Sequence, residues 1–228
     1  MPRLIRQFSI NVYLASRRWY NRVSEVAKRR IQNRIFRWRD VRFSPLEYAR
    51  IVEASAFLVK QSPGQTTTKL PLLKLLYLAD RESIRQTGQS ITGDAPAAME
   101  HGPILKCAYD MMKNPSAYPL WKKHLDSSKE KKEVTLTDDP GADHLSKLDI
   151  AILTKVWSEF GHLSAAQLRQ YTHDLPEYLK NEPETKTSND IPLADLLQAL
   201  GQSDRLEKIE REAAQIRAAH RKFSEYSR

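Results

Sequence analysis

A leucine-rich segment, residues 69–80, constrains the fold of this chain more than any other feature. It reads KLPLLKLLYLAD, and its leucines point in almost every direction around a helix. A helix that is apolar around most of its circumference is stable only where other elements cover it. We therefore predict a central, largely buried helix here. Gly88 is a suitable residue to end it, because glycine readily adopts the left-handed conformation found after helix C-termini.

Start and stop signals predict further helices on both sides of this segment. A serine followed three residues later by an acid or an amide side chain can form a capping box. This pair occurs at Ser44 with Glu47, Ser146 with Asp149, and Ser164 with Gln167. The first helix is predicted to end near Lys60. Gly102-Pro103 predicts another helix, through Met112, because proline suits the first helical position.

The remaining stretches carry loop signals and a little strand character. Residues 133–137 alternate as a short strand does, and a strong turn signal follows them. Residues 89–101 predict a small hairpin or extended loop, residues 126–132 a loop, and residues 181–190 a polar linker before a short helix at 193–200. We predict a mainly α protein: a compact helical domain with a small antiparallel β element, an N-terminal basic helical arm and a C-terminal charged helix.

The positive charge of the chain is concentrated in its first 42 residues. The whole sequence has a formal net charge of +9, and residues 1–42 hold 12 basic side chains opposed only by Glu25 and Asp40. The rest of the chain is therefore close to neutral, and the high isoelectric point describes the arm alone. Apolar residues at steps of three and four, from Phe8 to Val26, predict an amphipathic helix for the arm.

Four uses of this basic arm are compatible with its pattern. It can pack on its own chain with a solvated basic face, contact a partner protein, bind nucleic acid or lie on an anionic membrane. Cations interleaved with aromatic rings can grip phosphates and stack bases. The candidate contact residues are Arg17, Arg18, Trp19, Arg22, Arg29 and Arg30.

The C-terminal residues from Asp204 predict a charged helix. Its apolar positions run from Leu206 to Phe223 at steps of three and four, which is compatible with a short coiled-coil seam. Because the seam is short and includes alanine and histidine, we favour a helix that folds back on its own chain.

No catalytic or cofactor-binding signature is legible in the sequence. It contains no Walker, dinucleotide-binding, HExxH, CxxC or nucleophile-elbow motif. Its six histidines form no close pair with ligand spacing, and the single cysteine, Cys107, excludes an intramolecular disulfide and a multi-cysteine metal site. Because Cys107 falls inside a predicted helix, away from its amino end, we expect an ordinary buried thiol. We expect a protein that is not an enzyme and has no cofactor or metal.

The sequence also bears on location. It has no apolar run near the roughly 20 residues that span a membrane, and no hydrophobic core of a signal peptide. A single cysteine fits a reducing compartment. We expect a cytoplasmic protein without a transmembrane segment.

Three segments that occur in order resemble one known family. They are residues 68–80, which include Lys74, Tyr77 and Asp80; residues 91–94, ITGD; and residues 101–104, HGPI, with Tyr109 following. The sequence is similar here to the Panacea domain of SocA-like antitoxins. Residues 160–168 and 172–176 resemble the closing helices of that family, so the resemblance covers residues 44–179. One departure is Tyr178, where the family has a tryptophan.

The resemblance implies a mostly helical domain and a particular role. Members of the family are antitoxins of two-gene toxin–antitoxin modules, often on prophages, that neutralise a toxin by direct protein–protein binding. At least one member delivers its toxin to a protease. The implied partners are therefore a cognate toxin and, as a further candidate, a protease for regulated turnover. The alternative is a nucleic-acid-binding regulator that uses the basic arm. The sequence leaves the oligomeric state open.

The resemblance also supplies candidate site residues and a division of the chain. The motif positions that are candidates for partner binding are Lys74, Tyr77, Asp80, Gly93, Asp94, His101, Gly102, Pro103 and Tyr109. Structural roles compete with this interpretation: Gly93 can permit a tight turn, Tyr77 can hydrogen-bond within the core, and Asp94 can cap or brace a loop. Asp94, His101 and the loop between them are the best candidates for a polar surface feature. We expect a basic arm at 1–43, a Panacea-like helical domain at 44–180, and a linker with C-terminal helices at 181–228.

Overall fold

The computed structural model describes residues 45–127, 132–184, 187–209 and 211 of the chain. The basic arm with its six candidate contacts, the Ser44 cap and most of the charged tail lie outside these residues, so the predictions made for them stay predictions. By its internal contacts the chain divides into Met1–Arg42 and Phe43–Arg228. All of the described residues belong to the second unit.

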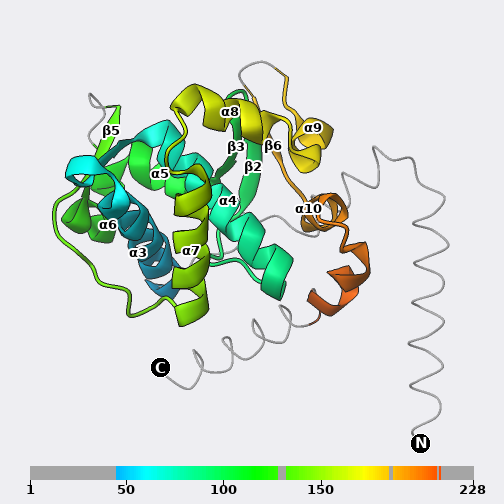
Figure 1. The fold of residues 1–228 in the computed structure, drawn as a ribbon, viewed down its shortest axis with the longest axis horizontal. Coiled ribbons are helices and arrows are strands. Elements are labelled where there is room, and N and C mark those ends of the chain that lie inside the picture. The colour runs from blue at the N-terminus through cyan, green and yellow to red at the C-terminus, as the bar shows by residue number, and fades with distance from the viewer. Residues whose placement is uncertain (1–44, 128–131, 185–186, 210, 212–228) are drawn as a thin grey trace, which may run out of the picture. The chain divides into compact units, whose positions relative to one another are not determined.

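The central element of the fold is helix α4, Lys69–Thr87, as the leucine-rich segment predicted (Figure 1). It packs against α3 (Pro45–Gln61), α7 (Lys147–Phe160), α8 (Ala165–His173) and strand β3 (Gly102–Leu105). Residues 72–80 of α4 are buried without interruption, so the helix is covered on all sides there. It ends at Gly88, whose φ of 84° is left-handed and whose N–H donates to the Ile84 carbonyl.

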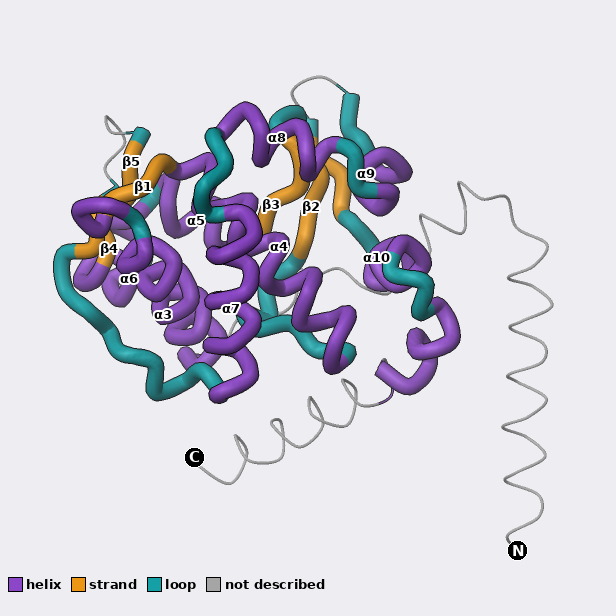
Figure 2. The backbone as a smooth tube through the Cα atoms, viewed as in Figure 1, coloured by secondary structure: helices purple, strands orange, loops and turns teal. Residues whose placement is uncertain are grey.

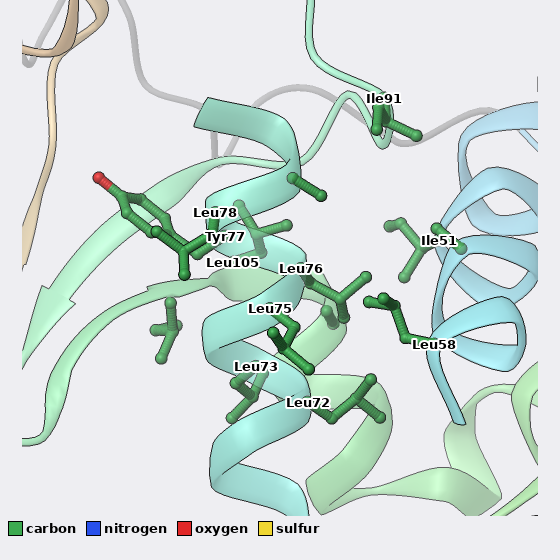
Figure 3. Close-up of a cluster of buried hydrophobic side chains, with 14 of the residues drawn as sticks. Ile51, Leu58, Leu72, Leu73, Leu75, Leu76, Tyr77, Leu78, Ile91 and Leu105 are labelled. Carbon is green, nitrogen blue, oxygen red and sulfur yellow. The ribbon is translucent and has the colours of Figure 1, made fainter. Parts of the chain in front are cut away.

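The hydrophobic core forms around α4. Leu72 and Leu76 lie on the side of the helix that faces Ile51 and Leu58 of α3, and Tyr77 points to the opposite side (Figure 3). The two leucines are completely buried, and burying such a side chain contributes about 1.5–3 kcal/mol. The bulkiest side chain of the core is Trp121 of α6 (Pro119–His124), whose indole N–H donates to the Ser127 hydroxyl at 2.9 Å.

Two of the predicted capping boxes are confirmed. In α7 the Ser146 hydroxyl accepts from the Asp149 N–H at 3.1 Å, and the Asp149 carboxylate accepts from the Ser146 N–H at 2.8 Å. Ser164 and Gln167 make the same reciprocal pair at the start of α8. The shorter helices are α5 (Lys106–Lys113), α9 (Pro176–Asn181) and α10 (Leu193–Ala199). Single turns of 3-10 helix occur at Pro63–Gln65, Pro115–Ala117 and Ser203–Arg205.

Two small antiparallel sheets complete the fold (Figure 2). One has the strand order β1 (Thr66–Thr68), β5 (Glu133–Leu136) and β4 (Leu125–Asp126). The other has the order β3, β2 (Pro96–Met99) and β6 (Ser188–Asp190). The predicted strand at 133–137 and the mainly α fold with antiparallel β structure are confirmed. The single β element that the sequence predicted is in fact two sheets.

The predicted start of the helix at Gly102-Pro103 is wrong. Residues 102–105 form β3, which pairs with β2 so that Gly102 lies opposite Met99 and Leu105 opposite Pro96. The helix begins only at Lys106, because the Asp94 carboxylate accepts from the N–H groups of Cys107 and Ala108 and so caps α5 from a distance. Cys107 is therefore in the first turn of this helix, although its thiol is buried as expected.

Three strands form in stretches where the sequence predicted none. The last three residues of the predicted polar linker 181–190 form β6, which pairs with β2. Asp126, at the start of a predicted loop, belongs to β4, and the threonines 66–68 form β1. For β1 and β6 a partner strand that is distant in sequence supplies the hydrogen bonds, whereas β4 pairs with the nearby β5. The three-part division of the chain stays a prediction.

A second, smaller hydrophobic cluster lies at the C-terminal end of α4. It consists of Ile84, Leu196, Leu197 and Ile209. The side chains of Gln202 and Arg205 both donate to the Arg85 carbonyl, one of the last in α4. These bonds satisfy a helix C-terminus that has no further turn to pair with. None of the described helices is long and apolar enough to cross a membrane.

Candidate functional site

The motif residues Lys74, Tyr77 and Asp80 follow one another at steps of three along α4, and each is bound to a different distant segment. Lys74 reaches β3, Tyr77 reaches α9, and Asp80 reaches the loop before β2. Steps of three keep side chains near one another on a helix surface. The three positions therefore form a line of buried polar groups, and each group fixes a separate part of the chain to the central helix.

The Lys74 amine is buried beside the β2–β3 hairpin. Its Nζ donates to the Pro103 carbonyl at 2.7 Å, and no part of the residue is exposed. Burial first, and then the charge of Arg169, lowers the pKa of Lys74 to about 7. One carbonyl replaces only part of the hydration of an ammonium ion, so the site favours the neutral amine near neutral pH.

Replacing Lys74 with methionine is expected to remove a pH-dependent contribution to stability. The pKa of Lys74 in the folded chain, about 7, lies below its ordinary 10.5. Between these values the unfolded chain binds the additional proton, so the stability of the wild type rises with pH. Across about pH 7.5–9.5, the free energy of unfolding of the wild type minus that of Lys74→Met should grow by about 1 kcal/mol per pH unit. Urea titrations at both limits measure it, and a difference that does not change with pH would contradict the assignment.

Tyr77 takes part in a buried network with Arg81 and Glu177. The Tyr77 hydroxyl donates to Glu177 Oε1 at 2.9 Å, and Arg81 Nε donates to the same oxygen at 2.6 Å. The Glu177 side chain is fully buried and that of Arg81 is 18% exposed. Burial and the neighbouring Glu177 carboxylate raise the pKa of the Tyr77 phenol, so the phenol stays a donor. The predicted hydrogen bond of Tyr77 within the core is confirmed.

Asp80 holds the loop that leads into β2. Its carboxylate accepts from the Ile91 N–H at 2.9 Å, the Thr92 N–H at 3.0 Å and the Thr92 hydroxyl at 2.5 Å. Burial raises the pKa of Asp80 to about 7, against the lowering effect of the hydrogen bonds from Thr92. The following Gly93 has a φ of 72°, a left-handed conformation that glycine adopts readily, and the tight turn predicted there stays a prediction.

Asp94 is not the surface feature that the sequence suggested. It is 3% exposed, and its carboxylate accepts three backbone hydrogen bonds, from Ala95 at 2.6 Å and from Cys107 and Ala108 at 3.0 and 2.9 Å. Burial raises the pKa of Asp94 to about 6, although these hydrogen bonds oppose the shift. The alternative role as a cap is confirmed. Its companion His101 is exposed, in the turn between β2 and β3.

Gly102, Pro103 and Tyr109 complete the motif. Gly102 has a φ of 92°, and a Cβ there would lie 2.7 Å from Lys74 Nζ, 2.9 Å from His173 Cδ2 and 3.0 Å from Thr172 Oγ1. Pro103 is buried and offers its carbonyl to Lys74. Tyr109 is half-buried against the core, with Lys113 Nζ 5.6 Å from its ring centre.

Tyr178, which stands where the family has a tryptophan, keeps a packing role and adds a hydrogen bond. It is 1% exposed, its hydroxyl donates to the Met99 carbonyl at 3.0 Å, and its ring lies 4.5 Å from that of His173. The residue thus ties α9 to the β2–β3 hairpin.

Four of the candidate contact residues, Lys74, Tyr77, Asp80 and Asp94, have buried side chains that are already hydrogen-bonded. In this conformation their side chains are therefore not available at the surface. Sequence reasoning missed Glu177 and Arg81, which neutralise each other across the core. No local signal marks them, because the pair is 96 positions apart along the chain. Within the described part of the chain, no three His, Cys, Asp or Glu side chains are grouped so as to hold a metal ion.

Comparison with known proteins gives one match. Residues 72–178 match the family model described as "Antitoxin SocA-like, Panacea domain". The match begins inside α4 and ends in α9, so it contains every motif residue discussed above and leaves α3 outside. It confirms the resemblance found in the sequence, over a shorter range. No curated protein and no solved structure matches the chain.

Proposed function

Because residues 72–178 match the SocA-like antitoxin domain, we propose that this protein is the antitoxin of a two-gene toxin–antitoxin module. It neutralises its toxin by binding it directly and performs no chemistry of its own. The family match is the single observation that carries this proposal. The location of the complex is the cytoplasm, where the toxin acts.

The buried polar line on α4 supports a mechanism by binding. Lys74, Tyr77 and Asp80 fix β3, α9 and the loop before β2 to one helix, and Asp94 fixes α5 to that loop. Segments fixed in this way lose little conformational entropy when they meet a partner, which favours tight association. The motif residues accordingly act as a frame, and exposed side chains make the contacts.

Exposed apolar side chains are the first candidates for those contacts. Among the described residues, the large apolar side chains with the highest exposure are Leu120, Leu148, Tyr171 and Leu179. Stable protein–protein interfaces bury about 800 Å² on each partner around a few apolar anchors. When the toxin binds over these exposed side chains, its active surface is covered and its substrate is excluded. The antitoxin then needs no catalytic step of its own.

Co-expression with the neighbouring gene tests this proposal. We expect the neighbouring gene alone to arrest growth, and the pair to grow and to yield a complex that copurifies. A copy of the present gene with an early stop codon is the matched control, because it keeps the RNA and removes the protein. Rescue by the stop-codon copy, a harmless neighbour, or rescue without a complex would contradict direct neutralisation.

A further inference from the structure

Basic side chains of α4 and α8 gather around a surface hollow that extends along α8. The hollow is lined by Leu70, Ala165, Ala166, Arg169, Gln170 and His173. Lys74 lies directly behind the hollow. A Cβ built on Gly102 would lie 2.7 Å from Lys74 Nζ and 2.9 Å from the Cδ2 atom of the His173 ring, so the two side chains approach each other there. One buried, one half-buried and one exposed basic side chain, Lys74, His173 and Arg169, therefore lie around the hollow.

These basic groups have no counter-ion. Among the described residues, neither Lys74, Arg169 nor His173 forms an ion pair with a carboxylate. Burial, Arg169 and Lys74 all lower the pKa of His173, whereas Glu182 and a hydrogen bond to the His101 backbone raise it. Glu182 is thus an acid that acts on the cluster through His173. His173 Nε2 is also buried without a hydrogen-bond partner.

We propose that this hollow is a binding site for a carboxylate, carried by a glutamate or aspartate side chain of an acidic protein segment. The Arg169 guanidinium is exposed and presents paired N–H donors, which match the two oxygens of a carboxylate. Leu70 and the methyl groups of Ala165 and Ala166 offer an apolar wall for the short aliphatic stem that precedes the charge. Lys74 and His173 lie behind it, and an anion in the hollow favours the protonated form of both groups.

The absence of internal compensation is what makes the site receptive. A carboxylate that enters gains the attraction of the Arg169 guanidinium, and among the described residues it needs to displace no acid paired with Arg169. A purely structural role for these side chains would not require an exposed guanidinium without a paired acid. An anion in the hollow should also favour the protonated His173 ring and move its titration to higher pH, a change that a purely structural histidine would not show.

The test uses the full chain, labelled for NMR, and glutarate as the probe because it combines a carboxylate with an aliphatic stem. We expect saturable shifts at Gln170 and His173, and a dissociation constant about tenfold higher in Arg169→Ala, as removal of one charge-assisted contact predicts. Lys123→Ala, which removes an exposed cation of α6, is the matched control and should bind as the wild type does.

Several results would overturn the assignment. Shifts that persist unchanged in Arg169→Ala, or that weaken equally in Lys123→Ala, indicate unspecific charge attraction. Inorganic phosphate is the second arm, and phosphate binding as tight as that of glutarate would remove the specificity for a carboxylate with a stem. Neither readout involves growth or a toxin, so the test stands apart from the antitoxin proposal and either can fail alone.

Discussion

Replacing Glu177 with alanine is expected to lower the free energy of unfolding by about 3–5 kcal/mol, the range seen when one member of a buried ion pair is removed. The Glu177 carboxylate is fully buried and accepts from both Arg81 and the Tyr77 hydroxyl. Its loss leaves a largely buried guanidinium without a counter-ion and a buried phenol without an acceptor. Both groups then bear their full cost of desolvation. Urea denaturation of the purified full chain measures the change.

The matched control for this prediction is Asp139→Ala. Asp139 pairs with Lys60, but the two side chains are 46% and 50% exposed. An exposed pair is worth less than about 1 kcal/mol, so this variant should unfold almost as the wild type does. If the two variants lose similar amounts of stability, the network around Glu177 does not hold α9 to α4 in the way described.

Replacing Gly102 with alanine is the second large effect that we expect, with a loss of about 2–5 kcal/mol from backbone strain and crowding together. The φ of 92° is unfavourable for any residue with a Cβ, and the new carbon would lie 2.7 Å from Lys74 Nζ. Lys74 cannot swing aside freely, because its amine is buried and bound to the Pro103 carbonyl. The Thr172 hydroxyl and the His173 ring close the other directions.

Gly141→Ala separates the two causes. Gly141 has a comparable φ of 76°, but a Cβ there would meet nothing within 4 Å. It should therefore lose only the backbone part, about 1–2 kcal/mol. Equal losses at Gly102 and Gly141 in thermal or urea unfolding would show that crowding against Lys74 is unimportant. A much larger loss at Gly102 would support the tight packing of α4, α8 and the hairpin.

These two positions, of which only Gly102 belongs to the motif, show how the motif residues on α4 are held in place. Because Gly102 has no side chain, the β2–β3 hairpin can approach Lys74 closely. Glu177 of α9 accepts hydrogen bonds from Tyr77 and Arg81 and so holds α9 against α4. The motif residues on α4 are each satisfied by a partner from another segment. The resemblance offered these residues as candidate contacts for a partner, which stays a prediction, and the structure shows that their side chains are buried and hydrogen-bonded. Arg169, which the motifs did not single out, is exposed at the hollow.

The sequence by itself determined the features that depend on residues within about one helical turn of each other. The leucines of α4, the capping boxes at Ser146 and Ser164 and the stop at Gly88 are of this kind, and all were predicted correctly. A cap or an apolar stripe acts through neighbours that the chain itself keeps close, so its energy is already present in the local sequence.

Only the tertiary structure decided the rest. Gly102-Pro103 has the local pattern of a helix start, but pairing with β2 and the cap from Asp94 move that start to Lys106. The threonines of β1 and the polar residues of β6 become strands because distant strands pair with them. Glu177 meets Tyr77 across 100 positions of sequence. The energies of such contacts depend on which segments the fold brings together, and no window of the sequence contains both partners.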